Sequence, residues 1–249
     1  MNKIILILIA VFMTIPVLSF AGGCMEASSD EGVNVVGYLQ SQFEYQMNED
    51  ENESSFTFNR ARMGLVGNIP YDFSYYIMFE YSAFKGGPYL LDGFITYSRL
   101  APFASVSWGQ FKSPFSLELN TPCQGLHTVR RSLVVNELTN PQRDMGLLFE
   151  GNYKEFASYA VSVTNGSEFG EVDNNENKMV SGRLVLSPVS FLNIGGSYKF
   201  STVPPQVDGL DEDERTRFAG EIELDFENIL VQAEYISAED IGSYTTGGG

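Results

Sequence analysis

Charged side chains recur at every second position in several parts of this 249-residue chain, and their chemistry is electrostatic rather than covalent. Arg60 and Arg62 form one such pair, and Glu221, Glu223 and Asp225 form a run of the opposite charge. Side chains two residues apart on an extended strand point to the same face of a sheet. This spacing predicts rows of charge that face water, where they act on passing ions.

Motifs for bond-making chemistry are not apparent. His127 is the only histidine, and we find no G-x-S-x-G, no HExxH and no cysteines paired at metal-binding spacing. The acidic run DGLDEDE has the composition of a calcium loop but lacks the spacing of an EF-hand. We therefore expect no enzyme, no catalytic residue, no metal and no cofactor. A barrel phospholipase that uses His127 is the enzymatic alternative.

The composition and the first residues indicate an exported protein. The net charge of −17 makes nucleic acid an improbable partner, and 43% hydrophobic residues are too few for a helical membrane protein. Residues 1–21 join Lys3 to an apolar run and end on Ser19-Phe20-Ala21, which predicts a cleaved signal peptide. A retained membrane helix is the alternative. We expect residues 22–32 to form a short periplasmic segment.

Two cysteines leave several possibilities open. Outside the cytoplasm, Cys24 and Cys123 can form a disulfide if the fold brings them together. The stretch from Ala21 to Cys24 also resembles a lipoprotein cleavage box, in which Cys24 would carry the lipid. The sequence does not decide between these.

The elements that must position the charged rows are strands, because apolar residues recur with a period of two. Between residues 33 and 47 the odd positions are mostly apolar, and the even positions are mostly polar. The same alternation follows from Phe218 to Phe226. One face of each segment suits hydrocarbon and the other suits water.

This alternation recurs about eleven times. Most of the segments reach ten residues, which is enough to cross a bilayer at a tilt, whereas ordinary globular strands average about 5 to 6 residues. The predicted strands lie near 33–46, 56–69, 73–84, 89–99, 103–112, 143–151, 155–165, 178–187, 191–200, 215–226 and 229–237. Their length favours an all-β, transmembrane, antiparallel up-and-down β-barrel.

The connections support the same interpretation. Polar loops alternate with tight turns along the chain, as in outer-membrane barrels with long external loops and short periplasmic turns. Acidic residues gather in the loops, and aromatic residues lie near strand ends, where membrane interfaces require them. A closed barrel pairs every backbone donor, so it is the β architecture that survives in lipid. Because bacterial barrels usually have an even number of strands, we expect residues 33–249 to be the N-terminal portion of a larger barrel.

The stretch GQFKSPFSLE, residues 109–118, ends the fifth predicted strand at Lys112, because Pro114 cannot donate to the ladder. About thirty residues, 113–142, follow before pairing resumes near Arg143. Connections of this length are usually functional. This loop also contains His127, Arg130 and Arg131, so it is the one long loop that is not dominated by acids.

Several stretches together resemble the phosphate-selective porin O and P family of Gram-negative outer membranes. They are GQFKSPFSLE, FNRARMGLVGNI, RRS followed by RDMGLLFEG, VTNGSEF and NKMVSGRLVLSP. The resemblance covers nearly all of the mature chain. It implies a sixteen-stranded homotrimeric barrel with an inward-folded third loop at about 113–142, so that about five strands would be missing here. It also implies an outer-membrane location, contact with lipid and lipopolysaccharide, and passive diffusion of small hydrophilic solutes or ions, including anions such as phosphate.

The resemblance and the strand phases together predict the side chains that line the pore. They are Arg60, Arg62, Lys112, Arg130, Arg131, Arg143, Arg183, Arg217, Glu44, Glu80, Asp92 and Glu118. Glu221, Glu223, Asp225 and Glu234 face the same side on this phase assignment. The predicted pore lining of this chain contains many acidic as well as basic side chains, and it has no dense lysine cluster. In both respects it differs from the selective members of the family.

Three other interpretations remain open at the level of sequence. The paired arginines can stiffen the wall by binding neighbouring acids, and those of the loop can pin it in place. The molecule can be a structural or adhesive barrel that acts through its acidic surface loops. It can also be a secreted soluble β-sandwich.

Overall fold

The structure is a computed structural model that describes residues 32–47, 52–167, 169–173, 175, 177–204 and 212–242. The expected signal peptide, 1–21, lies outside these residues. So do Cys24 and all but the last residue of the segment 22–32.

Within the described residues, eleven strands form one antiparallel sheet, and each strand pairs with its neighbours in sequence. Their bounds are β1 Val33–Met47, β2 Asn52–Ile69, β3 Phe73–Glu80, β4 Tyr89–Leu100, β5 Ala104–Lys112, β6 Arg143–Tyr153, β7 Ala157–Thr164, β8 Met179–Val189, β9 Leu192–Val203, β10 Asp213–Phe226 and β11 Ile229–Ile241. The all-β antiparallel expectation and the number of strands are confirmed.

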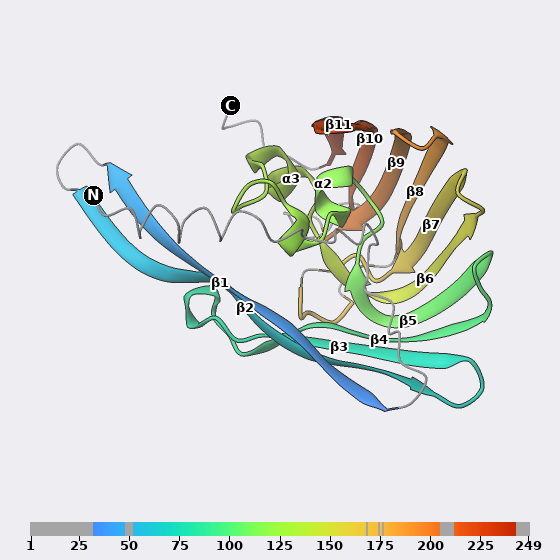
Figure 1. Ribbon diagram of the computed structural model, residues 1–249, viewed down its shortest axis with the longest axis horizontal. Coiled ribbons are helices and arrows are strands. Elements are labelled where there is room, and N and C mark those ends of the chain that lie inside the picture. Colours follow the sequence, from blue (N-terminus) through green and yellow to red (C-terminus); the bar gives the residue numbers. More distant parts are fainter. Residues whose placement is uncertain are drawn as a thin grey trace.

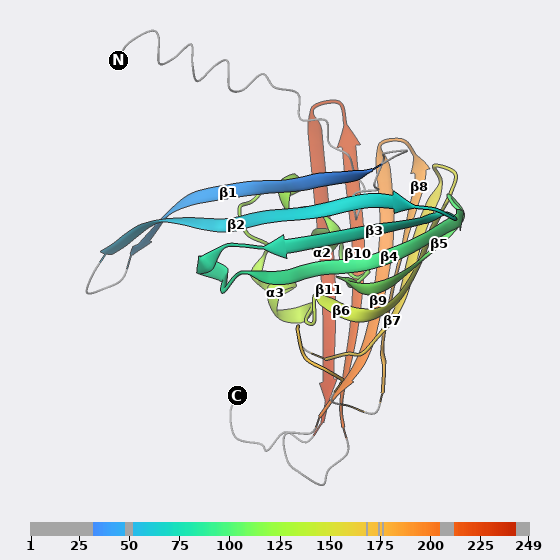
Figure 2. The same cartoon turned by 90° about the horizontal axis from the view of Figure 1, so that it is seen from below.

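The sheet curls around a hollow rather than packing on a second sheet. Figure 1 shows the strands curving from β1 to β11, with the helices of the β5–β6 connection on the concave side. The two edge strands lie apart in Figure 1, and Figure 2 shows how the strand direction turns progressively along the sheet. Within the described residues, β1 pairs only with β2 and β11 only with β10.

The alternation of side chains along the strands appears as an apolar outer face and a polar inner face. Trp108 is 68% exposed and Phe218 is 55% exposed, whereas the inward hydroxyls of Ser107, Ser162 and Ser181 are buried. Exposed apolar rows of this extent suit hydrocarbon. A search of the described residues for a helix that is long and apolar enough to cross a membrane finds none.

Two local irregularities shift the strand boundaries and phases. The pairing of β1 with β2 slips between Gln40 and Ser41, which leaves Asn59 as an extra residue beside Arg60. Strand β3 ends at Glu80 rather than continuing to 84 as the sequence predicts, because the Glu80 carboxylate accepts hydrogen bonds from Ala61 N and Ser82 N. A short 3₁₀ helix, η1 Ala83–Lys85, follows.

Residues 113–142, hereafter the β5–β6 loop, carry α2 Leu117–Asn120, the 3₁₀ helix η2 Cys123–Gly125 and α3 Leu133–Leu138. Ser116 and Ser132 cap α2 and α3, because their hydroxyls accept from the backbone N–H three residues later. The side chains of Phe115, Leu119 and Val135, all within the loop, are 0–2% exposed. The loop therefore has an apolar core of its own, which holds it as a folded body inside the hollow.

Candidate functional site

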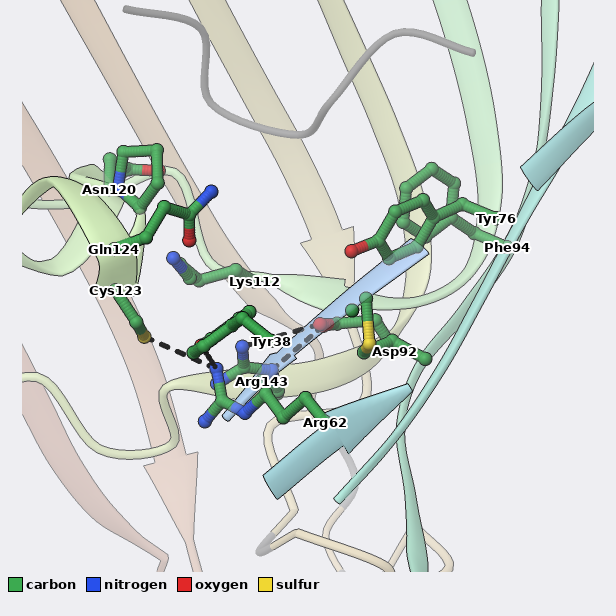
Figure 3. A pocket seen from close by; sticks show the side chains of 13 residues that line it. Tyr38, Arg62, Tyr76, Asp92, Phe94, Lys112, Asn120, Cys123, Gln124 and Arg143 are labelled. Carbon is green, nitrogen blue, oxygen red and sulfur yellow. Dashed lines mark hydrogen bonds and ion pairs between the residues drawn. The ribbon is translucent and has the colours of Figure 1, made fainter. Parts of the chain in front are cut away.

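A pocket of about 200 Å³ lies between the inner wall and the β5–β6 loop. Strands β1 to β4 provide one side, the loop provides the opposite side, and the ends of β5 and β6 complete it (Figure 3). Its lining consists of Gly37, Tyr38, Arg62, Tyr76, Met78, Asp92, Phe94, Lys112, Asn120, Pro122, Cys123, Gln124 and Arg143. Cationic, aromatic and amide groups thus meet at the place where the loop narrows the hollow.

Arg62 joins the wall to the loop. Its Nε donates to Glu80 Oε2 at 2.9 Å, and its Nη1 donates to the Tyr38 hydroxyl at 2.8 Å and to Cys123 Sγ at 3.2 Å. The Glu80 side chain is 1% exposed, so this ion pair is buried. Removing one partner of such a pair would leave an uncompensated charge, which is strongly destabilising.

Arg143 and Asp92 form a second buried ion pair in the pocket. Arg143 donates from Nε to Asp92 Oδ1 at 2.7 Å and from Nη2 to Oδ2 at 3.3 Å. The two-bond geometry holds the guanidinium plane in a fixed orientation. Lys112 lies between this pair and the loop, as Figure 3 shows.

Cys123 places a thiol among several cations. Its Sγ lies 3.6 Å from both Nη1 and Nη2 of Arg131, in addition to the contact with Arg62. Burial alone would raise the pKa of the thiol, but the charges of Arg62, Arg131 and Lys112 outweigh burial and lower its pKa to about 5. These cations therefore favour the thiolate form of Cys123.

Arg60 and Arg130 attach the tip of the loop to the wall. Arg60 donates to Val129 O at 2.9 Å and also binds Gln40 Oε1, while Asn59 donates to the same Val129 carbonyl at 2.9 Å. Arg130 forms an ion pair with Glu44 across the gap between loop and β1. The bulge in β2 makes this possible, because it brings Asn59 and Arg60 to one acceptor.

Arg131 stabilises the loop internally. Its guanidinium donates to the carbonyls of Glu118, Leu119 and Thr121 at 3.0–3.1 Å. The Glu118 carboxylate in turn accepts from the N–H and the hydroxyl of Ser132, at 2.7 and 2.6 Å. Both residues thus act within the loop, close to its helices.

Side chains of the later strands hold the two ends of the β5–β6 loop. Lys199 of β9 is 1% exposed and donates to Thr139 O at 2.9 Å and to Pro141 O at 2.8 Å. Hydroxyls of Ser113, Ser181 and Ser162 form a chain with separations of 3.0 and 2.7 Å. These contacts hold the two ends of the loop against β7 to β9.

The acids of β10 and β11 are not among the residues that line the pocket. Glu221 binds Arg183 through both carboxylate oxygens, and Arg217 pairs with Asp240. Glu234 accepts from the N–H groups of Leu117 and Glu118, at 2.8 and 3.3 Å. The carboxylate therefore satisfies the first turn of α2.

The structure divides the sequence-predicted residues into groups. Arg62, Lys112, Arg143 and Asp92 meet in the pocket, and Arg131 and Glu80 contact its lining residues. Six others lie elsewhere: Arg60, Arg130 and Glu44 at the loop tip, Glu118 within the loop, and Arg183 and Arg217 on the later strands. Within the described residues, no group of three metal-ligating acids, histidines or cysteines occurs.

Sequence reasoning missed several residues of this site. Tyr38 and Tyr76 lie on predicted strands but are not charged, and the sequence indicates Cys123 only as a possible disulfide partner of Cys24. Lys199 carried a usable signal, because it alternates with the buried Ser197 and Ser201 on β9 and so belongs to the inner face. Its acceptors are backbone carbonyls, which no sequence pattern identifies.

Comparison with known proteins gives matches of two kinds, one to a family model and one to solved structures. A family model described as "Phosphate-selective porin O and P" matches residues 33–227. Among solved structures, the fold is similar to "Anion-selective porin from Comamonas acidovorans", with a TM-score of 0.65 and 12% identity over 84% of this chain and 68% of that chain. Identity that low shows a shared fold alone. No curated protein sequence matches the chain.

Proposed function

Because the chain belongs to the phosphate-selective porin O and P family, a non-enzymatic family of outer-membrane porins, we propose that it lets small anions such as phosphate diffuse passively through a water-filled lumen. The observation that carries the proposal is the cationic pocket at the β5–β6 loop, where Lys112, Arg62 and Arg143 lie together. Charges at a constriction decide which ions pass, because the local dielectric is lower there than in bulk water.

The remaining candidate residues have supporting parts in this proposal. Arg60, Arg130 and Arg131 hold the loop at the width that the pore requires, with Glu44 and Glu118 as their acidic counterparts. Glu80 and Asp92 orient the pocket arginines. Arg183 and Arg217 balance the acids of β10 and β11, so that this wall does not repel anions strongly.

We also propose that these eleven strands are part of a larger closed wall. Within the described residues, β1 and β11 each leave one edge unpaired, which supports this, since an edge in lipid leaves backbone groups without partners. The matched anion-selective porin is also longer, since the chain spans 68% of it. Homotrimer formation and contact with lipopolysaccharide follow from the family resemblance and from the apolar outer face.

Planar-bilayer recording on the complete barrel tests the proposed selectivity. In a salt gradient, Lys112→Gln should move the zero-current potential toward cations, because it removes one positive charge from the pocket. Lys154→Gln is the matched control, since it removes the same charge from the exposed β6–β7 turn. It should leave the potential unchanged.

Two results would contradict the proposal. A potential that Lys112→Gln does not move would exclude anion selection at this pocket. A silent bilayer, together with binding of the protein to cell surfaces, would favour the structural or adhesive barrel instead.

A further inference from the structure

The pocket has an aromatic side that conduction of inorganic anions does not require. We propose that it is a binding site for a single-ring aromatic carboxylate, with the ring held by Tyr76 and Phe94 and the carboxylate directed to Lys112 and Arg62. This inference rests on the proposed function, because the solute must enter the lumen to reach the pocket.

The ring pair is built into the wall. Tyr76 of β3 and Phe94 of β4 are neighbours in the register, and their rings stack with centroids 5.3 Å apart and planes 21° apart. Both side chains are only half-buried, and both line the pocket. Aromatic rings prefer offset-stacked or edge-on partners, so a third ring adds favourably to such a pair.

The opposite side of the pocket supplies charge and hydrogen-bond donors. Figure 3 shows Lys112, Asn120 and Gln124 across the pocket from the two rings, with Arg62 and Arg143 below them. Asp92 is the one carboxylate in the lining, and Arg143 binds both of its oxygens. The other acidic group, the thiol of Cys123, is bound by Arg62 and Arg131, so that Lys112 is the main cation for the ligand. A ligand that combines a flat apolar group with an anionic group matches this division.

The volume limits the size of the ligand. At about 200 Å³ the pocket is smaller than the roughly 300–1,000 Å³ of sites for drug-sized molecules, so it suits one ring rather than two. Inorganic phosphate would fill only the cationic part. Next to the apolar surfaces of Tyr76, Phe94 and Met78, phosphate would lose part of its hydration shell without gaining a hydrogen bond from those surfaces.

A second explanation of the rings is that they only support the loop. Under that explanation, replacing Phe94 by an apolar residue of similar size would affect loop order but would not discriminate between aromatic and aliphatic anions. The two explanations therefore differ in ligand preference, which is measurable.

The first test is calorimetric titration of the complete barrel in detergent with benzoate, acetate and inorganic phosphate. Benzoate should bind most tightly. Phe94→Leu removes the ring but keeps an apolar side chain, and should weaken benzoate binding about 3- to 10-fold while acetate binding stays the same. Lys112→Gln should weaken binding of both carboxylates. Tyr97→Leu, on the same strand outside the pocket lining, is the matched control.

The second test is recording of single channels, in which benzoate should cause brief blockades that Phe94→Leu shortens. If channels open but benzoate binds no more tightly than acetate, the proposed binding site for an aromatic carboxylate is wrong, whereas the proposed porin function is supported. If benzoate binds as expected but no channel opens, the proposed binding site is supported, whereas the proposed diffusion through the lumen is wrong. Circular dichroism verifies that each variant is folded.

Discussion

The thiol of Cys123 illustrates how neighbouring charges change the chemistry of a single side chain. Two guanidinium groups lie within 3.2–3.6 Å of Sγ, so the negative form is favoured in spite of burial. Because these cations lower the pKa of the Cys123 thiol to about 5, the thiolate is favoured at neutral pH. It is lost as the pH falls through that value.

We predict a distinctive pH dependence for modification of Cys123 by methyl methanethiosulfonate. The rate should be nearly constant from about pH 6 to about pH 8, whereas a thiol with a pKa of about 8.5 accelerates roughly 80-fold over that range. Lys112→Gln should move the midpoint upward, because it removes one of the cations that lower the pKa. A midpoint above about pH 8 in the unmodified protein would contradict the assignment.

Among the secondary-structure elements, the β5–β6 loop depends on contacts with strands that follow it. Lys199→Met should loosen the end of the loop near Pro141, because it removes two hydrogen bonds to backbone carbonyls, each worth about 0.5–1.5 kcal/mol. Trypsin should then cleave after Arg130 and Arg131 faster than in the unmodified protein. Timed digestion in detergent measures this rate.

Lys178→Met is the control for that change. Lys178 is exposed and pairs with Asp173 outside the loop, so its removal should not alter cleavage at Arg130. Equal digestion rates for the unmodified protein and Lys199→Met would show that Lys199 does not hold the loop.

The strands and the loop differ in how well their sequences predict them. A period of two is a local property, so the phases of β1 and β10 follow from residues 33–47 and 218–226 alone. The contact of Arg62 with Cys123 joins residues 61 positions apart, and the folded loop decides it. The end of β3 also escaped prediction, since it depends on a carboxylate that replaces the ladder at Ser82.

For the molecule as a whole, the apolar outer face predicts which side chains contact lipid. Trp108 is the single tryptophan, and it lies on that face. Brominated lipid should therefore quench its fluorescence strongly, while iodide in the lumen should not. Steady-state fluorescence of the reconstituted barrel measures both.

A relocated tryptophan completes that measurement. In Trp108→Phe/Gln42→Trp the fluorophore moves to the inner face of β1, where Gln42 donates to Thr57. Iodide should now quench and brominated lipid should not. The reverse pattern would mean that the two faces are assigned the wrong way round.

The contacts between the β5–β6 loop and the later strands also constrain the order of assembly. The backbone of Leu117 binds a carboxylate that lies 117 positions further along the chain, and Ser113 binds a hydroxyl 68 positions further along. The β5–β6 loop can therefore reach its final position only after β8 and β11 have taken theirs. We expect the narrowing of the channel to follow the pairing of these later strands.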